Sequence, residues 1–135
     1  MQCNNNYHFK KSYLSMFQVT LNGRPGLVVS GGMFTGSSNL TTVEFYDVTS
    51  GQWVSLPGLV EGRRGHSMMV EGGRMVVVGG MAGDHTYLNT MEVFNGERWV
   101  TSEQRLRTGR QGFSVVKVPA QKLKRKIRRI SRRRS

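Results

Sequence analysis

Apolar positions along the chain form short runs that end at paired glycines. The run Met75 to Val78 lies between glycine pairs at 72–73 and 79–80. Its three successive valines favour extended backbone, because branching at Cβ restricts χ1 and packs well on a pleated surface. The following pair of glycines can adopt positive φ where the chain has to turn. The pattern therefore predicts a buried strand that ends at Gly79.

The same pattern occurs 48 residues earlier, where residues 22–32 run from a Gly-Arg step through an apolar strand to a second glycine pair. After each pair comes a polar loop and then a segment that ends in an aromatic residue and Asp or Asn, at 42–47 and 90–95. A tryptophan strand follows, and a lead-in with Arg and Gly, at 64–65 and 110–112, precedes the next unit. A repeat of this period with about four short strands is typical of a β-propeller blade.

The pattern predicts an all-β fold, a partial propeller of four-stranded antiparallel blades. The expected strands are 16–20, 27–30, 43–46 and 53–56 in one blade, and 67–70, 75–78, 91–94 and 99–101 in the next. We divide the chain into a polar N-terminal segment (1–12), repeats (13–118) and a basic tail (119–135) that is disordered or helical. The repeats comprise blades at 13–56 and 65–101 and the first strand of a further blade at 112–118.

These features resemble the kelch-repeat family of β-propellers. The likeness covers roughly residues 13–118, which hold two complete units and the start of a third, whereas family propellers close with more blades. It rests on the lead-in arginines and on eight repeat residues: Gly31, Gly32, Tyr46, Trp53, Gly79, Gly80, Phe94 and Trp99. The resemblance implies that the first strand of each blade lies nearest the central channel and that the domain binds a protein partner.

The loops at one end of the blades are the expected binding face. Successive antiparallel strands reverse direction, so loops 33–39, 81–87, 58–64 and 102–110 emerge together. Similar kelch domains bind partners on this face, often with an arginine of the lead-in, which by matching position implies Arg64 and Arg110. A guanidinium can grip a carboxylate bidentately, so we expect a partner with an acidic motif. The further expected contacts are Phe34, Ser37, Asn39, Asp84, His85 and Tyr87.

Each candidate also has a structural interpretation. Arg64 and Arg110 fit equally well as residues that bond loop carbonyls and fix the blade junction. We expect Trp53 and Trp99 to pack between neighbouring blades rather than to stack on a ligand. The glycine pairs lack the surroundings of a phosphate-binding motif, and the histidines lack ligand-spaced neighbours. We expect no metal, no cofactor and no catalytic residue, because no carboxylate pair or activated nucleophile is evident.

The charge is concentrated in the tail. Of 20 Lys and Arg residues, nine lie in residues 120–135, and they include Lys124, Arg125, Lys126, Arg128 and Arg129. The remaining 11 basic and 8 acidic residues give the rest of the chain a net charge of +3. The tail therefore predicts an alternative function, which is binding of nucleic acid or an anionic surface, or nuclear targeting. A solvated tail without a function is also consistent with this composition.

The remaining expectations concern location and assembly. Cys3 is the one cysteine, which favours a reducing compartment, and no apolar run is long enough for a signal peptide or membrane span. We expect a cytoplasmic or nuclear protein. Related kelch proteins recognise substrates for ubiquitin ligases, a role that depends on a BTB region, and none precedes these repeats. Two units leave two open blade faces, so we expect a fragment of a longer propeller or self-association.

Overall fold

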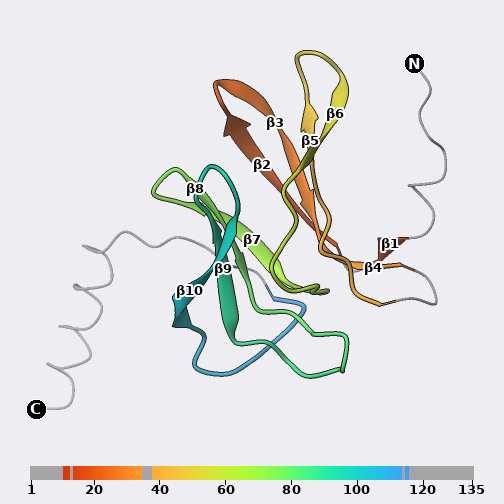
Figure 1. Cartoon of the computed structure of the whole chain (residues 1–135), viewed down its shortest axis with the longest axis vertical. Coiled ribbons are helices and arrows are strands. Elements are labelled where there is room, and N and C mark those ends of the chain that lie inside the picture. The colour runs from red at the N-terminus through yellow and green to blue at the C-terminus, as the bar shows by residue number, and fades with distance from the viewer. Residues whose placement is uncertain (1–10, 13, 35–37, 114, 116–135) are drawn as a thin grey trace, which may run out of the picture.

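The computed structural model describes residues 11–12, 14–34, 38–113 and 115. This part of the chain is all β, with two four-stranded antiparallel sheets beside each other and one two-stranded sheet (Figure 1). The predicted fold class is confirmed. Ser37 and the basic tail lie outside the described residues, and so does most of the predicted strand 112–118. Residues 112, 113 and 115 of that strand are described and are not in a strand.

The two large sheets are the two predicted blades. The first blade has the order β2 (Ser15–Leu21), β3 (Arg24–Ser30), β5 (Val43–Asp47) and β6 (Gln52–Leu56). The second has the order β7 (Ser67–Glu71), β8 (Arg74–Val78), β9 (Thr90–Phe94) and β10 (Trp99–Arg105). All eight expected strands are present. β10 continues to Arg105, which pairs with Thr90 of β9 after an irregularity that follows Thr101. The predicted loop 102–110 is therefore wrong over residues 102–105.

Both glycine pairs turn the chain as their sequence predicts. Their φ angles are positive: 58° and 92° at Gly31 and Gly32, and 63° and 97° at Gly79 and Gly80. There is also no room for a side chain at Gly80, because a Cβ there would lie 2.7 Å from the carbonyl oxygen of Arg64. A side chain at these positions would therefore clash with the segment that enters the next blade.

A short sheet that the sequence did not predict precedes the first blade. In it β1 (Lys11–Ser12) pairs with β4 (Met33–Phe34), with Ser12 opposite Met33. In the second blade Met81, 48 residues after Met33, forms the corresponding bridge with Arg64. Lys11 and Ser12 thus run along the first blade as Arg63 and Arg64 run along the second. A strand of only two polar residues, Lys11 and Ser12, shows no alternation of apolar and polar positions, so the sequence pattern could not predict this pairing.

The apolar core lies between the two blades. The first blade contributes Val28, Val43 and Phe45, the linker contributes Leu59, and the second blade contributes Met68, Met75, Val77, Phe94 and Trp99. Among the described strands, β2 and β7 are the two from different blades whose backbones come close. The first strands of the blades are therefore nearest each other and the last strands splay apart, as the resemblance implied for strands around a channel (Figure 1).

Candidate partner-binding face and blade junction

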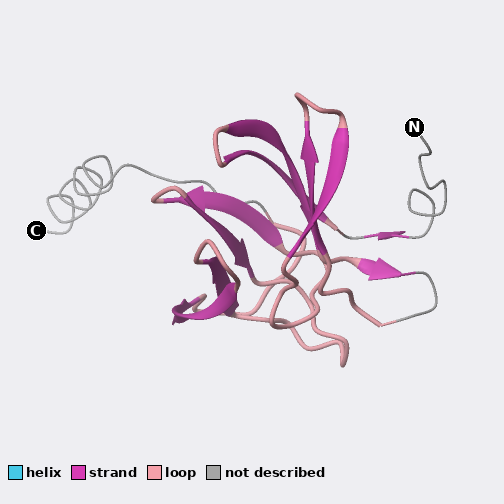
Figure 2. Cartoon of the chain, turned by 45° about the horizontal axis from the view of Figure 1, so that its top comes forward, coloured by secondary structure: helices cyan, strands magenta, loops and turns pink. Residues whose placement is uncertain are grey.

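In each blade one loop joins the second strand to the third, which is β3 to β5 in the first blade and β8 to β9 in the second. These two loops gather with the linker between the blades at one end of the sheets (Figure 2). Two backbone bonds join them: Leu59 donates to the Thr41 carbonyl at 2.7 Å, and Gly32 donates to the Arg63 carbonyl at 2.8 Å. The expected common end of these loops is confirmed. This end of the molecule contains the candidate face, which we call the loop face.

Arg64 contacts both loops of the loop face. Its backbone exchanges two hydrogen bonds with Met81, at 3.1 and 2.8 Å. Its guanidinium donates to the Sδ atoms of Met33 and Met81, both at 3.0 Å, and lies 3.5 Å from Asn39 Oδ1. Thioether sulfur is a weak acceptor. The half-buried guanidinium of Arg64 is therefore held in place by groups that a carboxylate would outcompete.

Asn39 and the Met81–Tyr87 loop surround Arg64. The Asn39 amide nitrogen donates to the Met81 carbonyl at 2.7 Å and to the Gly62 carbonyl at 3.4 Å, which ties the two loops and the linker together. Tyr87 forms a bridge with Met81 and has an exposed side chain. Asn39 thus lies next to Arg64, whereas Tyr87 lies on the other side of Met81 from it.

The tip of that loop is shaped by local bonds. Asp84 Oδ1 accepts hydrogen bonds from the Thr86 hydroxyl at 2.6 Å and the Thr86 N–H at 3.1 Å, and these lower the pKa of Asp84. His85 has a φ of 67°, a left-handed conformation that closes the turn. Both side chains are exposed. Of the other predicted contacts, Phe34 has its backbone in β4 and its side chain outside the description, and Ser37 lies outside it altogether.

In the structure Arg110 does not correspond to Arg64, with which its position in the repeat was matched. Its carbonyl accepts from Gly80 N at 2.7 Å, as the Arg63 carbonyl accepts from Gly32 N at 2.8 Å. Arg110 is therefore the equivalent of Arg63, and matching it with Arg64 is wrong. The sequence held the signal, because Arg63 and Arg110 are 47 residues apart, like Ser67 and Ser114. The Arg110 side chain is exposed.

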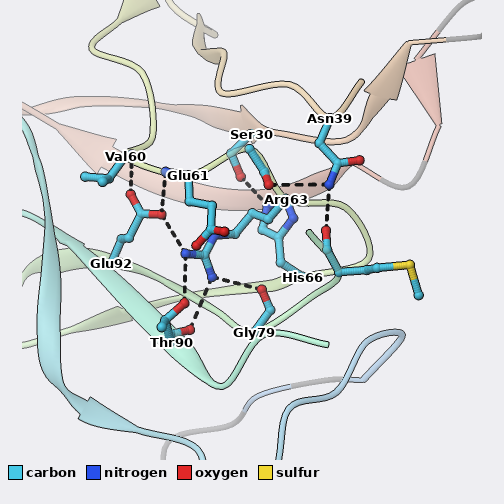
Figure 3. A network of polar contacts seen from close by, with 11 residues as sticks. Ser30, Asn39, Val60, Glu61, Arg63, His66, Gly79, Thr90 and Glu92 are labelled. Atoms are coloured by element: carbon cyan, nitrogen blue, oxygen red, sulfur yellow. Dashed lines mark hydrogen bonds and ion pairs between the residues drawn. The ribbon is translucent and has the colours of Figure 1, made fainter. Parts of the chain in front are cut away.

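Arg63 is the functional residue that the sequence reasoning missed. It is fully buried and forms an ion pair with the buried Glu92, with Nη2 and Oε2 at 2.6 Å (Figure 3). Its guanidinium also donates to the carbonyls of Gly79 at 2.9 Å and Thr90 at 3.2 Å. The carbonyl-bonding role considered for Arg64 and Arg110 belongs to Arg63.

Glu92 completes this connection from the second blade. Its carboxylate accepts the backbone N–H groups of Val60 at 2.6 Å and Glu61 at 3.3 Å (Figure 3). A buried ion pair is tolerable when further hydrogen bonds satisfy both charges, and removal of one partner leaves the other uncompensated. Arg63 and Glu92 therefore fix the linker to the second blade, and we call this cluster the blade junction.

His66 links the two blades beside that cluster. Its Nε2 and the Ser30 hydroxyl on β3 share a hydrogen bond of 2.8 Å (Figure 3). Burial, with the nearby positive charge of Arg63, lowers the pKa of His66 to about 4. The ring is therefore neutral at neutral pH. Among the described residues, no three His, Cys, Asp or Glu side chains form a cluster that could hold a metal ion.

The tryptophans have different environments. Trp99 is 3% exposed and packs on Phe94 with ring centroids 5.4 Å apart, so its predicted place between the blades is confirmed. Trp53 is 47% exposed and contacts Tyr46 at 5.0 Å, so the same prediction is wrong for Trp53. The physical reason is that the face of the first blade that carries Trp53 has no second sheet against it in the described part of the chain.

Comparison with known proteins relates the chain to one family model and to solved structures, among them that of YjhT. Residues 62–101 match the family model described as the Kelch motif, which spans the second blade and its lead-in. The solved structure of YjhT superposes with a TM-score of 0.62 at 17% identity, over 76% of this chain and 40% of the length of YjhT. No curated protein matches the sequence.

Two four-stranded antiparallel blades joined by a short linker define a propeller-type repeat protein. Residues 62–101 carry a kelch motif, and the two sheets have the four-stranded antiparallel form of propeller blades. The kelch repeat is in general a protein-interaction fold. Within the described residues no helix is long and apolar enough to cross a membrane.

Proposed function

We propose that this chain is a non-enzymatic protein-binding module that engages an acidic segment of its partner through the loop face. The observation that carries the proposal is the position of Arg64. The neighbouring Arg63 has a buried carboxylate and two carbonyls as acceptors. Arg64 stands half-buried at the end where the loops gather, with two thioethers and one amide oxygen around it.

The surroundings of Arg64 suit a peptide with a carboxylate. A carboxylate that replaces the methionine sulfurs gains two charge-assisted hydrogen bonds. The exposed ring of Tyr87, on the other side of Met81, supplies an apolar surface on the same loop. Arg110 is exposed, and its backbone N–H donates to the Leu88 carbonyl at the end of the same loop. Its positive charge steers an acidic segment towards the face. Arg64 is thus the expected anchor and Arg110 a weaker contribution at the rim.

The test is binding of a panel of fluorescently labelled acidic peptides, measured by anisotropy. Arg64→Ala should weaken the best binder by roughly 10- to 100-fold, since a hydrogen bond to a charged group contributes about 1.5–3 kcal/mol. Thermal unfolding should change by no more than about 0.5 kcal/mol, as is typical of a surface substitution. Arg98→Ala, which removes an exposed charge from the turn before Trp99, is the matched control.

A stable Arg64→Ala chain that binds every peptide as the unchanged chain does would refute the role of the loop face. Loss of stability in Arg64→Ala with binding unchanged would support the structural interpretation of this arginine instead.

Two finer functions rest on the sequence alone. A role in substrate recognition for a ubiquitin ligase, in the cytoplasm or nucleus, would use the same face to capture an acidic segment of the substrate. Binding of nucleic acid or an acidic surface through Lys124, Arg125, Lys126, Arg128 and Arg129 stays a prediction, because these residues lie outside the described part of the chain.

A further inference from the structure

The outer face of the first blade repeats the face that the second blade buries in the core. In the first blade Met16 pairs with Val29, and Val29 with Glu44. In the second blade the corresponding row runs from Met68 through Val77 to Glu92. The aromatic pairs also correspond, since Tyr46 and Trp53 meet at 49° and Phe94 and Trp99 meet at 49°. The side chains of the outer face thus already have the arrangement of a blade contact.

The two faces differ in what covers them. Met68 is 4% exposed, whereas its equivalent Met16 is 55% exposed. Trp99 is 3% exposed, whereas its equivalent Trp53 is 47% exposed. Met16 and Trp53 lie at opposite edges of this face, on β2 and β6, with Val29 and Tyr46 on the strands between them. An apolar patch that spans the face of a sheet is of the kind that marks an interaction site. We call this patch the receiving face.

The other half of such a contact is present on the opposite side of the same chain. The first blade presents Phe17, Val28, Val43 and Phe45 towards the second blade. The positions that correspond to them by strand pairing are Met69, Val76, Met91 and Val93, and these residues line a hollow on the outer side of the second blade. We call this hollow the donating face. Its side chains include a valine where the first blade has Phe45, which leaves room for a large residue.

The lead-in segment of a blade contact is also in place on the receiving side. Lys11 and Ser12 pair with β4 as the lead-in to the second blade pairs with Met81. Among the residues that the structure describes, the receiving face therefore has the strand that enters a blade contact but not the apolar sheet of a neighbouring blade. Repeat proteins depend on such nearest-neighbour burial for their stability.

We propose that copies of this chain assemble head to tail, with the donating face of one copy packed on the receiving face of the next. Met16 and Trp53 are buried in this contact as Met68 and Trp99 are buried within one chain. The contact joins two different surfaces, so each added copy exposes a new receiving face and a new donating face. Such an arrangement gives rings or open chains rather than a two-fold dimer.

The test is the mass of the full chain in solution by sedimentation and light scattering. The unchanged chain should form species larger than a dimer as its concentration rises, from a monomer of 15.2 kDa. Trp53→Asp should abolish the receiving face, and Met91→Asp the donating face, so each variant alone should be monomeric. A mixture of the two should give a one-to-one dimer that grows no further, because one intact face of each kind remains. Arg98→Asp is the matched control and should assemble normally.

A second measurement does not depend on charged substitutions in a sheet. Trp99→Phe leaves Trp53 as the one tryptophan of the two, and its emission should shift to shorter wavelength as assembly proceeds. A monomeric unchanged chain at about 100 μM with constant Trp53 emission would overturn the proposal. Assembly of either charged variant alone, or folded variants that stay monomeric when mixed, would overturn it as well.

Discussion

The two faces that carry Trp99 and Trp53 hold equivalent side chains in opposite surroundings. Trp99 lies in the core between the blades, and Trp53 lies on an outer strand with nearly half of its surface exposed. On the buried face, the Glu92 carboxylate accepts hydrogen bonds from the Val60 N–H of the linker and from the buried Arg63 guanidinium. The difference shows that the repeat specifies which residues form a contact surface, whereas burial depends on whether a neighbouring blade is present.

The largest expected effect comes from truncating the two tryptophans. Trp99→Ala should lower the free energy of unfolding by about 3–5 kcal/mol, because it empties a site in the core. Trp53→Ala should cost less than about 1 kcal/mol in dilute monomer, where water already reaches the ring. Urea unfolding of both variants at low protein concentration measures the difference. Equal losses would contradict the exposed position of Trp53.

A smaller effect is expected from acid. The pKa of His66 is lowered to about 4 by burial, from an ordinary value of 6.5. The unfolded chain therefore binds the proton first as the pH falls below 6.5, and the stability present above that pH is lost progressively down to about pH 4. The loss amounts to about 3 kcal/mol, since one pKa unit corresponds to about 1.36 kcal/mol.

The matched variant for the acid effect is His66→Phe. A Cβ on Gly31 would lie 2.7 Å from His66 Cε1, and a Cβ on Gly79 would lie 2.9 Å from Phe113 Cζ. Phe113 is therefore the equivalent of His66, and phenylalanine is the side chain that the chain itself uses there. The variant should lose this part of the pH dependence between 6.5 and 4 in unfolding experiments. An unchanged slope of stability against pH would show that His66 does not titrate abnormally.

The strands could be predicted from the sequence because each blade repeats local signals. Valine runs, glycine pairs and an Asp or Asn at the turn recur at a nearly constant interval, and all eight strands followed from them. The turn residues act alike in both blades, since Asp47 accepts the Thr49 N–H and Asn95 accepts the Glu97 N–H, both at 2.9 Å. These features are local, so a single sequence reveals them.

The blade junction could not be predicted in the same way, because it depends on tertiary neighbours. Two adjacent arginines differ completely: Arg63 turns into the core towards Glu92, and Arg64 turns towards the loop face. The 47-residue spacing of Arg63 and Arg110 is consistent with this difference, and the backbone bonds that equate the two residues establish it. The small sheet of β1 and β4 could not be predicted for a related reason, since it joins segments more than 20 residues apart in the sequence.

The blade junction is tested most directly by a double-mutant cycle on Arg63 and Glu92. Arg63→Met and Glu92→Gln should each destabilise the fold by about 3–5 kcal/mol, because each leaves a buried group without its partner. The double variant should lose clearly less than the sum of the two, with a coupling energy of about 2 kcal/mol or more in urea unfolding. Losses that add to within about 0.5 kcal/mol would contradict the claim that this pair joins the linker to the second blade.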